Sequence, residues 1–211
     1  MRRWYPALLV VLTFAASIFA YPRLPDRVPT HWNIHGQVDA YGSRWIATFL
    51  IPGMLIALWG LLRVLPRIDP RRENYASMQG TYDLVVNVTL TLLAVVHFVV
   101  LGAVMGAPIS IGRFVPAIIG GALVIIGKVL PRARPNWWFG IRTPWTLSND
   151  RVWERTHHVG GYVMTVVGVL AILASVLDLT IASVAVGIAA GALGLGLIAY
   201  SYFAWKQETS R

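Results

Sequence analysis

Two histidines and an aspartate in the N-terminal part of the chain are residue types that could do chemistry together. His31, His35 and Asp39 follow one another at intervals of four residues. On a helix this spacing would place them on one face, where two imidazoles and a carboxylate could hold a zinc ion. Pro29 and Gly36 argue against a continuous helix here, so the metal site is a weak candidate. Alternatively, His31 and Asp39 hydrogen-bond within the loop, or these groups bind a ligand or a proton.

A second polar set lies inside an apolar segment. Asp83, Asn87 and His97 share one helical sector with Thr91. Polar side chains at bilayer depth are costly and usually face protein or water. We expect them to hydrogen-bond to other helices, and a pathway for protons or a small ligand is the alternative. The sequence shows no nucleophile placed beside a base and no glycine-rich phosphate loop, so we predict that the protein is not an enzyme and needs no cofactor.

The composition indicates which medium surrounds the elements that position these residues. Hydrophobic residues make up 56% of the 211 residues and charged residues only 13%, whereas about a quarter of a soluble domain is charged. Segments of roughly 17–25 apolar residues can cross the hydrocarbon layer as helices. Six segments fit, at about 5–21, 45–65, 84–106, 113–130, 160–177 and 180–203. We therefore predict an all-α, polytopic membrane protein, a bundle of six transmembrane helices.

The first segment could also be a signal peptide, because Arg2 and Arg3 give it a basic start. The small residues needed for cleavage are poorly placed before Tyr21, however. We therefore expect an uncleaved signal anchor.

The positive charges predict the orientation. Of the 18 Lys and Arg residues, only Arg23, Arg27, Arg44 and Arg113 fall on one side of the predicted spans. Cytoplasmic loops of membrane proteins carry the excess of positive charge. Both termini should therefore be cytoplasmic (N-in, C-in), with the 22–44 loop outside and the 131–158 loop inside. The arginines lie between apolar runs, so we expect membrane lipid rather than direct nucleic-acid contact.

The two long loops should differ in structure. Prolines and turn-forming glycines predict that the 22–44 loop is an ordered, irregular cap. In the 131–158 loop, Ser148 or Asn149 should cap a helix that starts near residue 150 and runs toward the fifth span. We expect one side of that helix to carry Trp153, Thr156 and His157. This region is either an interfacial helix on the membrane surface or a docking surface for a cytoplasmic partner.

The last two spans are joined only by residues 177–180, which predicts an antiparallel helical hairpin. Gly187 and Gly191 form a small-xxx-small pair in the final span, a pattern that lets helices approach closely. We expect this pair to pack within the monomer. A homodimer face is the alternative, and the oligomeric state stays open.

Two motifs resemble known families. The pattern around the outer loop, with Asp69-Pro70-Arg71 and Asn74 after the second span, resembles the DUF1648 family and assigns residues 1–75 to it. Its loop residues are Pro29, His31, Trp32, Asn33, Gly36 and Asp39; His35 is not part of the family pattern. The pattern of the inner loop resembles the SdpI family and assigns residues 76–211 to it. Its residues are Asn136, Phe139, Gly140, Arg142, Thr143, Pro144, Trp145, Asn149, Trp153 and His157.

The resemblance implies a function. Proteins of the SdpI type are immunity proteins of the bacterial plasma membrane that protect the producing cell from a secreted, membrane-active peptide toxin. The founding member is also implied to hold a winged-helix repressor at the membrane. If so, His31, Trp32, Asn33, Gly36 and Asp39 are candidates for toxin binding, and the inner-loop residues are candidates for docking a partner. A small transporter or proton-coupled channel, suggested by the polar set in the third span, is the alternative.

Overall fold

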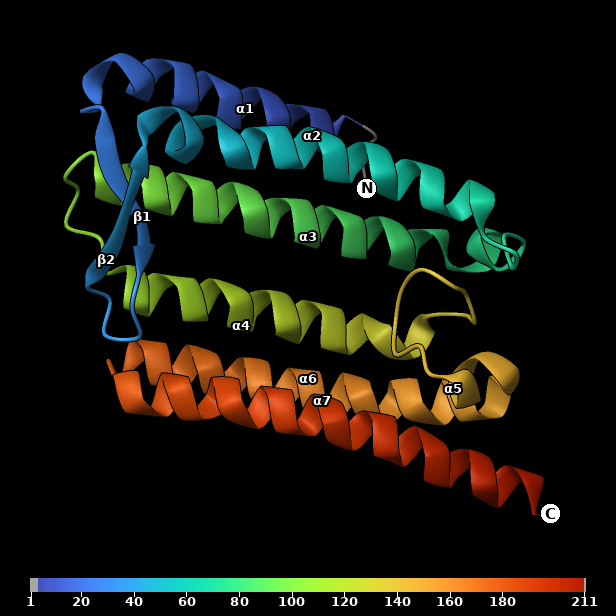
Figure 1. Cartoon of the computed structure of the whole chain (residues 1–211). Helices are drawn as coiled ribbons and strands as arrows, with labels where there is room; N and C mark the ends of the chain where they lie inside the picture. The colour runs from blue at the N-terminus through green and yellow to red at the C-terminus, as the bar shows by residue number, and fades with distance from the viewer. Residues whose placement is uncertain (1–3, 211) are drawn as a thin grey trace.

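The computed structural model describes residues 4–210 and is a bundle of long helices with a β-hairpin at one end (Figure 1). Arg2, Arg3 and Arg211, which entered the orientation argument, lie outside the described residues. The elements are α1 (Tyr5–Ala20), η1 (Tyr21–Arg23), β1 (Arg27–Trp32), β2 (Val38–Ser43), α2 (Arg44–Ile68), α3 (Asn74–Val104), α4 (Ile111–Val129), η2 (Leu130–Arg132), α5 (Pro144–Ser148), α6 (Asp150–Val176) and α7 (Thr180–Thr209).

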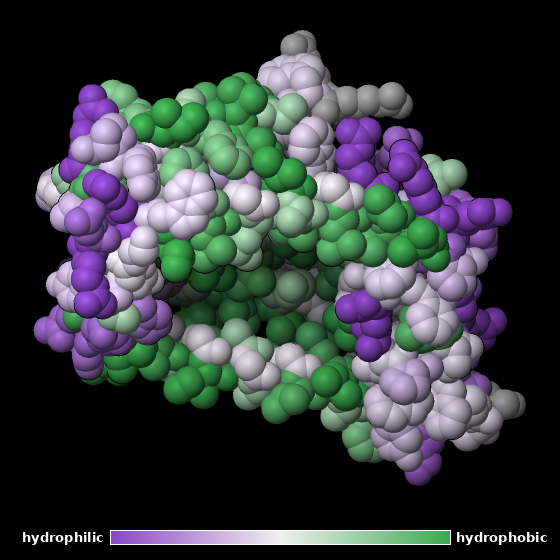
Figure 2. Space-filling view, turned by 45° about the horizontal axis from the view of Figure 1, so that its top comes forward, coloured by the Kyte–Doolittle hydropathy of each residue, from purple (hydrophilic) through white to green (hydrophobic). Residues whose placement is uncertain are grey.

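Six helices, α1 to α4, α6 and α7, are long and apolar enough to cross a membrane. Protein buries only part of the most apolar stretch of each helix, from 6% in α7 to 39% in α6. Figure 2 shows apolar residues across the middle of the molecule and hydrophilic residues gathered at its two ends. Exposed apolar surface of this extent requires lipid, which confirms a helical, multi-pass membrane protein.

The hairpin and the 133–149 loop lie at opposite ends of the bundle, and α1 and α7 place both described ends of the chain toward the loop end (Figure 1). This arrangement agrees with the predicted loop placement. We call the hairpin end the outer end and the loop end the inner end, after the predicted orientation. Which of them faces the cytoplasm stays a prediction.

The bundle consists of two halves that meet along α3 and α4 (Figure 1). The hairpin and α1 to α3 form the first half, and α4, α6 and α7 form the second. Paired glycines bring α4 and α6 together. A Cβ on Gly120 would lie 2.7 Å from the backbone oxygen of Gly168, and one on Gly127 would lie 2.7 Å from that of Gly161. Such contacts let two backbones approach closely.

The prediction that Gly187 and Gly191 pack within the monomer is wrong. Among the described residues, no atom of another element lies within 4 Å of a Cβ placed on either glycine. The expected antiparallel pairing of α6 and α7 is present, but it does not use this glycine pair. The homodimer alternative stays a prediction.

Candidate functional site at the two ends of the bundle

The outer loop is a β-hairpin, so the expectation of an irregular cap is wrong. β1 and β2 pair antiparallel, with irregular register between Pro29 and Trp32. The side-chain oxygen of Asn33 accepts the backbone N–H of His35 at 2.9 Å and that of Gln37 at 3.0 Å. Gly36 adopts φ +74°, a conformation that favours glycine. Asn33 and Gly36 therefore build the turn, because an asparagine side chain can mimic a backbone turn.

His31 and Asp39 face each other across the hairpin. Nδ1 of His31 lies 2.5 Å from Oδ1 of Asp39, and the two side chains are 67% and 42% exposed. This confirms the hypothesis of a hydrogen bond within the loop. Residues 4–210 contain no group of three His, Cys, Asp or Glu side chains that could hold a metal. The metal candidate is therefore wrong, because the hairpin puts His35 in the turn, away from the pair.

The hairpin connects the two halves of the bundle. At its base, Val28 and Leu24 are buried in a cluster with Ala20 and Leu101 of the first half. At its tip, the turn lies against the start of α4: a Cβ on Gly112 would be 3.4 Å from Cα of Gly36. The exposed His31–Asp39 pair therefore lies on a hairpin that packs against the first half of the bundle at its base and against α4 at its turn.

At the inner end, the buried carboxylate of Asp69 joins the segment after α2 to the loop after α4. One oxygen accepts the backbone N–H of Arg71 at 2.7 Å. The other accepts the hydroxyl of Tyr75 and the backbone N–H of Trp137, both at 2.9 Å. Asp69 is only 3% exposed, and a buried carboxylate needs such donors to offset its lost hydration.

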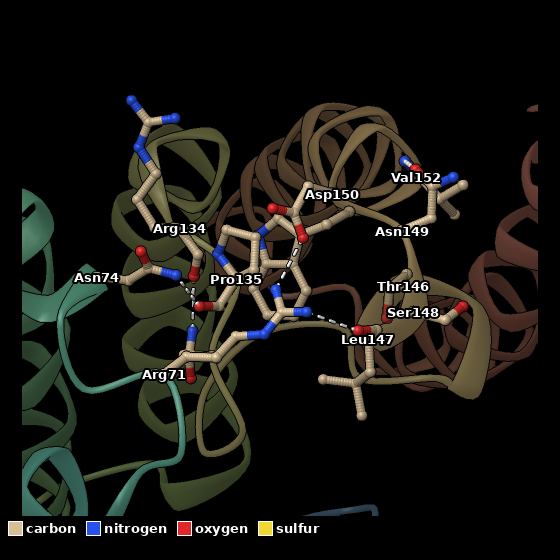
Figure 3. Close-up of polar contacts among 12 residues, drawn as sticks. Arg71, Asn74, Arg134, Pro135, Thr146, Leu147, Ser148, Asn149, Asp150 and Val152 are labelled. Carbon is tan, nitrogen blue, oxygen red and sulfur yellow. Dashed lines mark hydrogen bonds and ion pairs between the residues drawn. The ribbon is translucent and has the colours of Figure 1, made fainter.

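Arg71 and Asn74 strengthen the same junction, as Figure 3 shows. The guanidinium of Arg71 donates to Asp150 at 2.8 Å and to the carbonyl of Leu147 at 3.0 Å. The amide of Asn74 donates to the carbonyl of Pro135 at 2.8 Å. We call Asp69, Arg71 and Asn74 the inner clamp. These three residues hold the first half of the bundle against both sides of the inner loop.

Asn136 organises the tryptophan-rich turn of the inner loop. Its side-chain oxygen accepts the backbone N–H groups of Trp138 at 2.9 Å and Phe139 at 2.7 Å. Its amide donates to the carbonyls of Arg134 at 2.9 Å and Phe139 at 3.0 Å. The asparagine is fully buried, whereas the side chains of Trp137 and Trp138 are 48% and 39% exposed.

Trp153 and His157 fill the space beneath the loop. Their rings stack with centroids 4.0 Å apart. The indole of Trp153 donates to the carbonyl of Ala133 at 2.8 Å. Nε2 of His157 accepts the backbone N–H of Ile141 at 3.0 Å, so its proton must sit on Nδ1, which lies 2.8 Å from the carbonyl of Trp153. Gly140 has φ +108°, and a Cβ there would collide with the imidazole.

Two caps shape the rest of the motif. The hydroxyl of Thr143 and that of Thr146 form a capping box at α5. The side-chain oxygen of Asn149 accepts the backbone N–H groups of Arg151 and Val152 at 2.9 and 3.2 Å, which confirms the predicted cap. The helix that follows runs without interruption into the fifth span. The interfacial-helix hypothesis is wrong, because the expected face of Trp153, Thr156 and His157 is fully buried in protein.

The predicted docking residues therefore divide into two groups. Asn136, Thr143, Trp153 and His157 are buried and support the loop from within. The remaining ones are accessible at least in part, namely Phe139, Gly140, Arg142, Pro144, Trp145 and Asn149. The exposed indoles of Trp137 and Trp138, which we had not predicted as site residues, extend the accessible surface.

The polar set of the third span connects helices. His97 is fully buried, and its Nε2 lies 2.9 Å from Oγ of Ser17, which donates to the carbonyl of Thr48 at 2.7 Å. Because the serine proton is used in that bond, Nε2 of His97 is the donor to Ser17. The hydroxyls of Thr91 and Tyr5 are 2.7 Å apart. These contacts are the expected hydrogen bonds between helices.

Asp83 and Asn87, the other two members of the polar set, line a cavity. Asn87 is buried, and Asp83 is half-buried. Both face a cavity between α1, α2 and α3.

Comparisons with known proteins match both ends of the chain to described families. Residues 8–56 match a domain of unknown function (DUF1648), and residues 132–202 match the SdpI/YfhL protein family. The chain is 28% identical over 167 residues to Immunity protein SdpI of Bacillus subtilis (strain 168), which covers 79% of this chain and 78% of that protein. No solved structure matches.

The six spans define the class of the molecule, a multi-pass helical membrane protein. Within that class, the chain is similar to the SdpI/YfhL protein family over residues 132–202 and to the DUF1648 domain over residues 8–56. The DUF1648 match ends at residue 56, so the inner clamp, which we had grouped with that region, lies beyond the matched range.

Proposed function

We propose that this protein protects the bacterium that makes it against a secreted peptide toxin that acts on the plasma membrane. One observation carries the proposal: the 28% identity to Immunity protein SdpI extends over 79% of the chain. The fold supports it, because the two motifs occupy ordered positions at opposite ends of the bundle.

The outer hairpin is the proposed site of interception. Its exposed surface combines the imidazole of His31, the carboxylate of Asp39 and the half-buried indole of Trp32. A peptide that inserts into membranes presents both apolar and polar side chains, and this mixed surface offers partners for both. Because the hairpin is fixed on both halves of the bundle, little conformational entropy is lost when a peptide binds.

The inner loop is the proposed docking site for a cytoplasmic partner, a winged-helix repressor if this chain also signals the presence of toxin. Its accessible surface offers the indoles of Trp137 and Trp138 and the guanidinium of Arg142. Aromatic residues and arginine are enriched where protein surfaces carry binding energy. The buried residues of the motif fix the shape of this surface.

The proposal is tested in the native bacterium without knowing the toxin. A strain that lacks this gene is exposed to culture supernatant of its parent, and survival is compared with and without a plasmid copy of the gene. We expect the deletion strain to be killed and the complemented strain to survive. Equal survival of all strains, at culture densities at which the parent secretes its peptides, would show that the chain does not confer immunity.

A further inference from the structure

A cavity of about 500 Å³ lies at the inner end of the first half, apart from the two loops discussed above. It is lined by residues of the first turn of α1, the last turns of α2 and the first turns of α3. The helix α1 begins at Tyr5, whereas α2 continues to Ile68 beyond it (Figure 1). Within the described residues, α1 is therefore shorter at this end than α2 and α3.

Three charged side chains line the cavity. Arg63 and Arg67 lie one turn apart on α2, and Asp83 lies on α3. Within residues 4–210, none of the three forms an ion pair. The guanidinium of Arg63 lies 5.7 Å from the ring centroid of Trp59, which also lines the cavity. Two unpaired cations and one unpaired anion in one cavity suit a ligand with an anionic group and a hydrogen-bond donor.

The surroundings indicate that this ligand is a lipid. Leu61, Val64 and Ile68 of α2 are 52%, 43% and 56% exposed. Apolar side chains on a membrane-spanning helix face acyl chains, and tryptophan and arginine gather at the level of the headgroups. A phospholipid therefore meets both requirements, because its acyl chains can follow α2 while its headgroup enters the cavity.

We propose that this cavity binds the headgroup of a phospholipid that carries a hydrogen-bond donor, such as phosphatidylethanolamine or phosphatidylglycerol. The phosphate is held by the guanidinium groups of Arg63 and Arg67, and the amine or hydroxyl is held by the carboxylate of Asp83. A choline headgroup keeps the positive charge but has no N–H or O–H donor, so phosphatidylcholine cannot form the charge-assisted hydrogen bond to Asp83. This lipid site does not depend on the proposed immunity function.

Retention of lipid by the purified full-length protein tests the proposal. The protein is incubated with equal amounts of phosphatidylethanolamine and phosphatidylcholine with identical acyl chains, and bound lipids are counted by native mass spectrometry. We expect about tenfold preference for phosphatidylethanolamine, the ratio that one charge-assisted hydrogen bond gives. The double variant Arg63→Gln, Arg67→Gln should lose about tenfold in retention of both lipids.

Two further variants separate the roles of the charges. Arg72→Gln, Arg132→Gln removes the same charge from exposed arginines at the inner end that do not line the cavity, and it should retain lipid as the unmodified protein does. Asp83→Ala should still bind lipid but lose the preference for the ethanolamine headgroup. Equal retention of the two lipids by the unmodified protein would overturn the proposal. So would an equal loss in the control variant, or full displacement of lipid by the same concentration of water-soluble glycerophosphoethanolamine.

Discussion

The backbone N–H of Trp137 donates a hydrogen bond of 2.9 Å to the buried carboxylate of Asp69, 68 positions earlier in the chain. Asp69 follows α2 in the first half of the bundle, and Trp137 lies in the loop after α4 in the second. The turn of the outer hairpin makes the corresponding connection at the other end, where Gly36 lies against Gly112. The two halves are thus joined at both ends as well as along α3 and α4.

At the inner clamp, we expect removal of a buried group to reduce the free energy of unfolding more than removal of an exposed charge. Asp69→Ala leaves three donors without their acceptor, and each buried group of this kind costs about 1–3 kcal/mol. We expect the free energy of unfolding in detergent to fall by about 3 kcal/mol. Asp150→Asn, which removes only the charge of a largely exposed partner of Arg71, should cost less than about 1 kcal/mol. Equal losses in the two variants would contradict the role assigned to the buried carboxylate.

Gly140 should not tolerate a side chain. Gly140→Ala places a Cβ at φ +108° and against the imidazole of His157, so strain and collision add. We expect a loss of at least about 2 kcal/mol in the free energy of unfolding. Gly60→Ala is the matched control, because a Cβ there meets nothing within 4 Å among the described residues, and alanine favours a helix. The explanation fails if Gly60→Ala destabilises the protein as much.

The outer pair should be required for protection. His31→Ala and Asp39→Ala each remove one member of the exposed pair, and loss of a residue central to binding costs at least about 2 kcal/mol, roughly 30-fold in affinity. We expect either variant to lower, by roughly 30-fold, the dose of supernatant that kills half of the cells. His35→Ala is the control, since only the backbone of that residue takes part in the turn. Full protection by both pair variants, at normal membrane levels, would exclude interception by this pair.

His97 should act in packing and not in conduction. Ser17→Ala removes the acceptor of the buried imidazole, and we expect it to cost about 1–2 kcal/mol in the free energy of unfolding. Liposomes with the unmodified protein should show no more proton flux than empty ones. A proton flux that disappears in His97→Gln, without loss of stability, would instead support the transporter alternative.

The sequence predicts well those features that depend on local composition. The spans follow from runs of apolar residues, and the start of α6 follows from Asn149, because a cap is a local hydrogen-bond pattern. The β-hairpin was missed because Pro29 and Gly36 indicated an irregular loop, whereas the strand pairing depends on contacts between Arg27–Trp32 and Val38–Ser43.

Features that depend on distant contacts could not be predicted in the same way. Asp69 and Arg71 stand out as charged residues after a span, but nothing local shows that they bind a loop more than 60 positions later. The contact of Gly120 with Gly168 was missed for a related reason. Glycines occur in several spans, and only the packing of α4 on α6 selects this pair.

Protection from a secreted peptide requires that the hairpin faces outward while the inner loop faces the cytoplasm. The chain contains no cysteine, so single cysteines can report the side of each exposed position. We expect a membrane-impermeant maleimide to label His35→Cys in intact cells and Ser148→Cys only after permeabilisation. Labelling of both positions in intact cells, or of Ser148→Cys alone, would contradict the account.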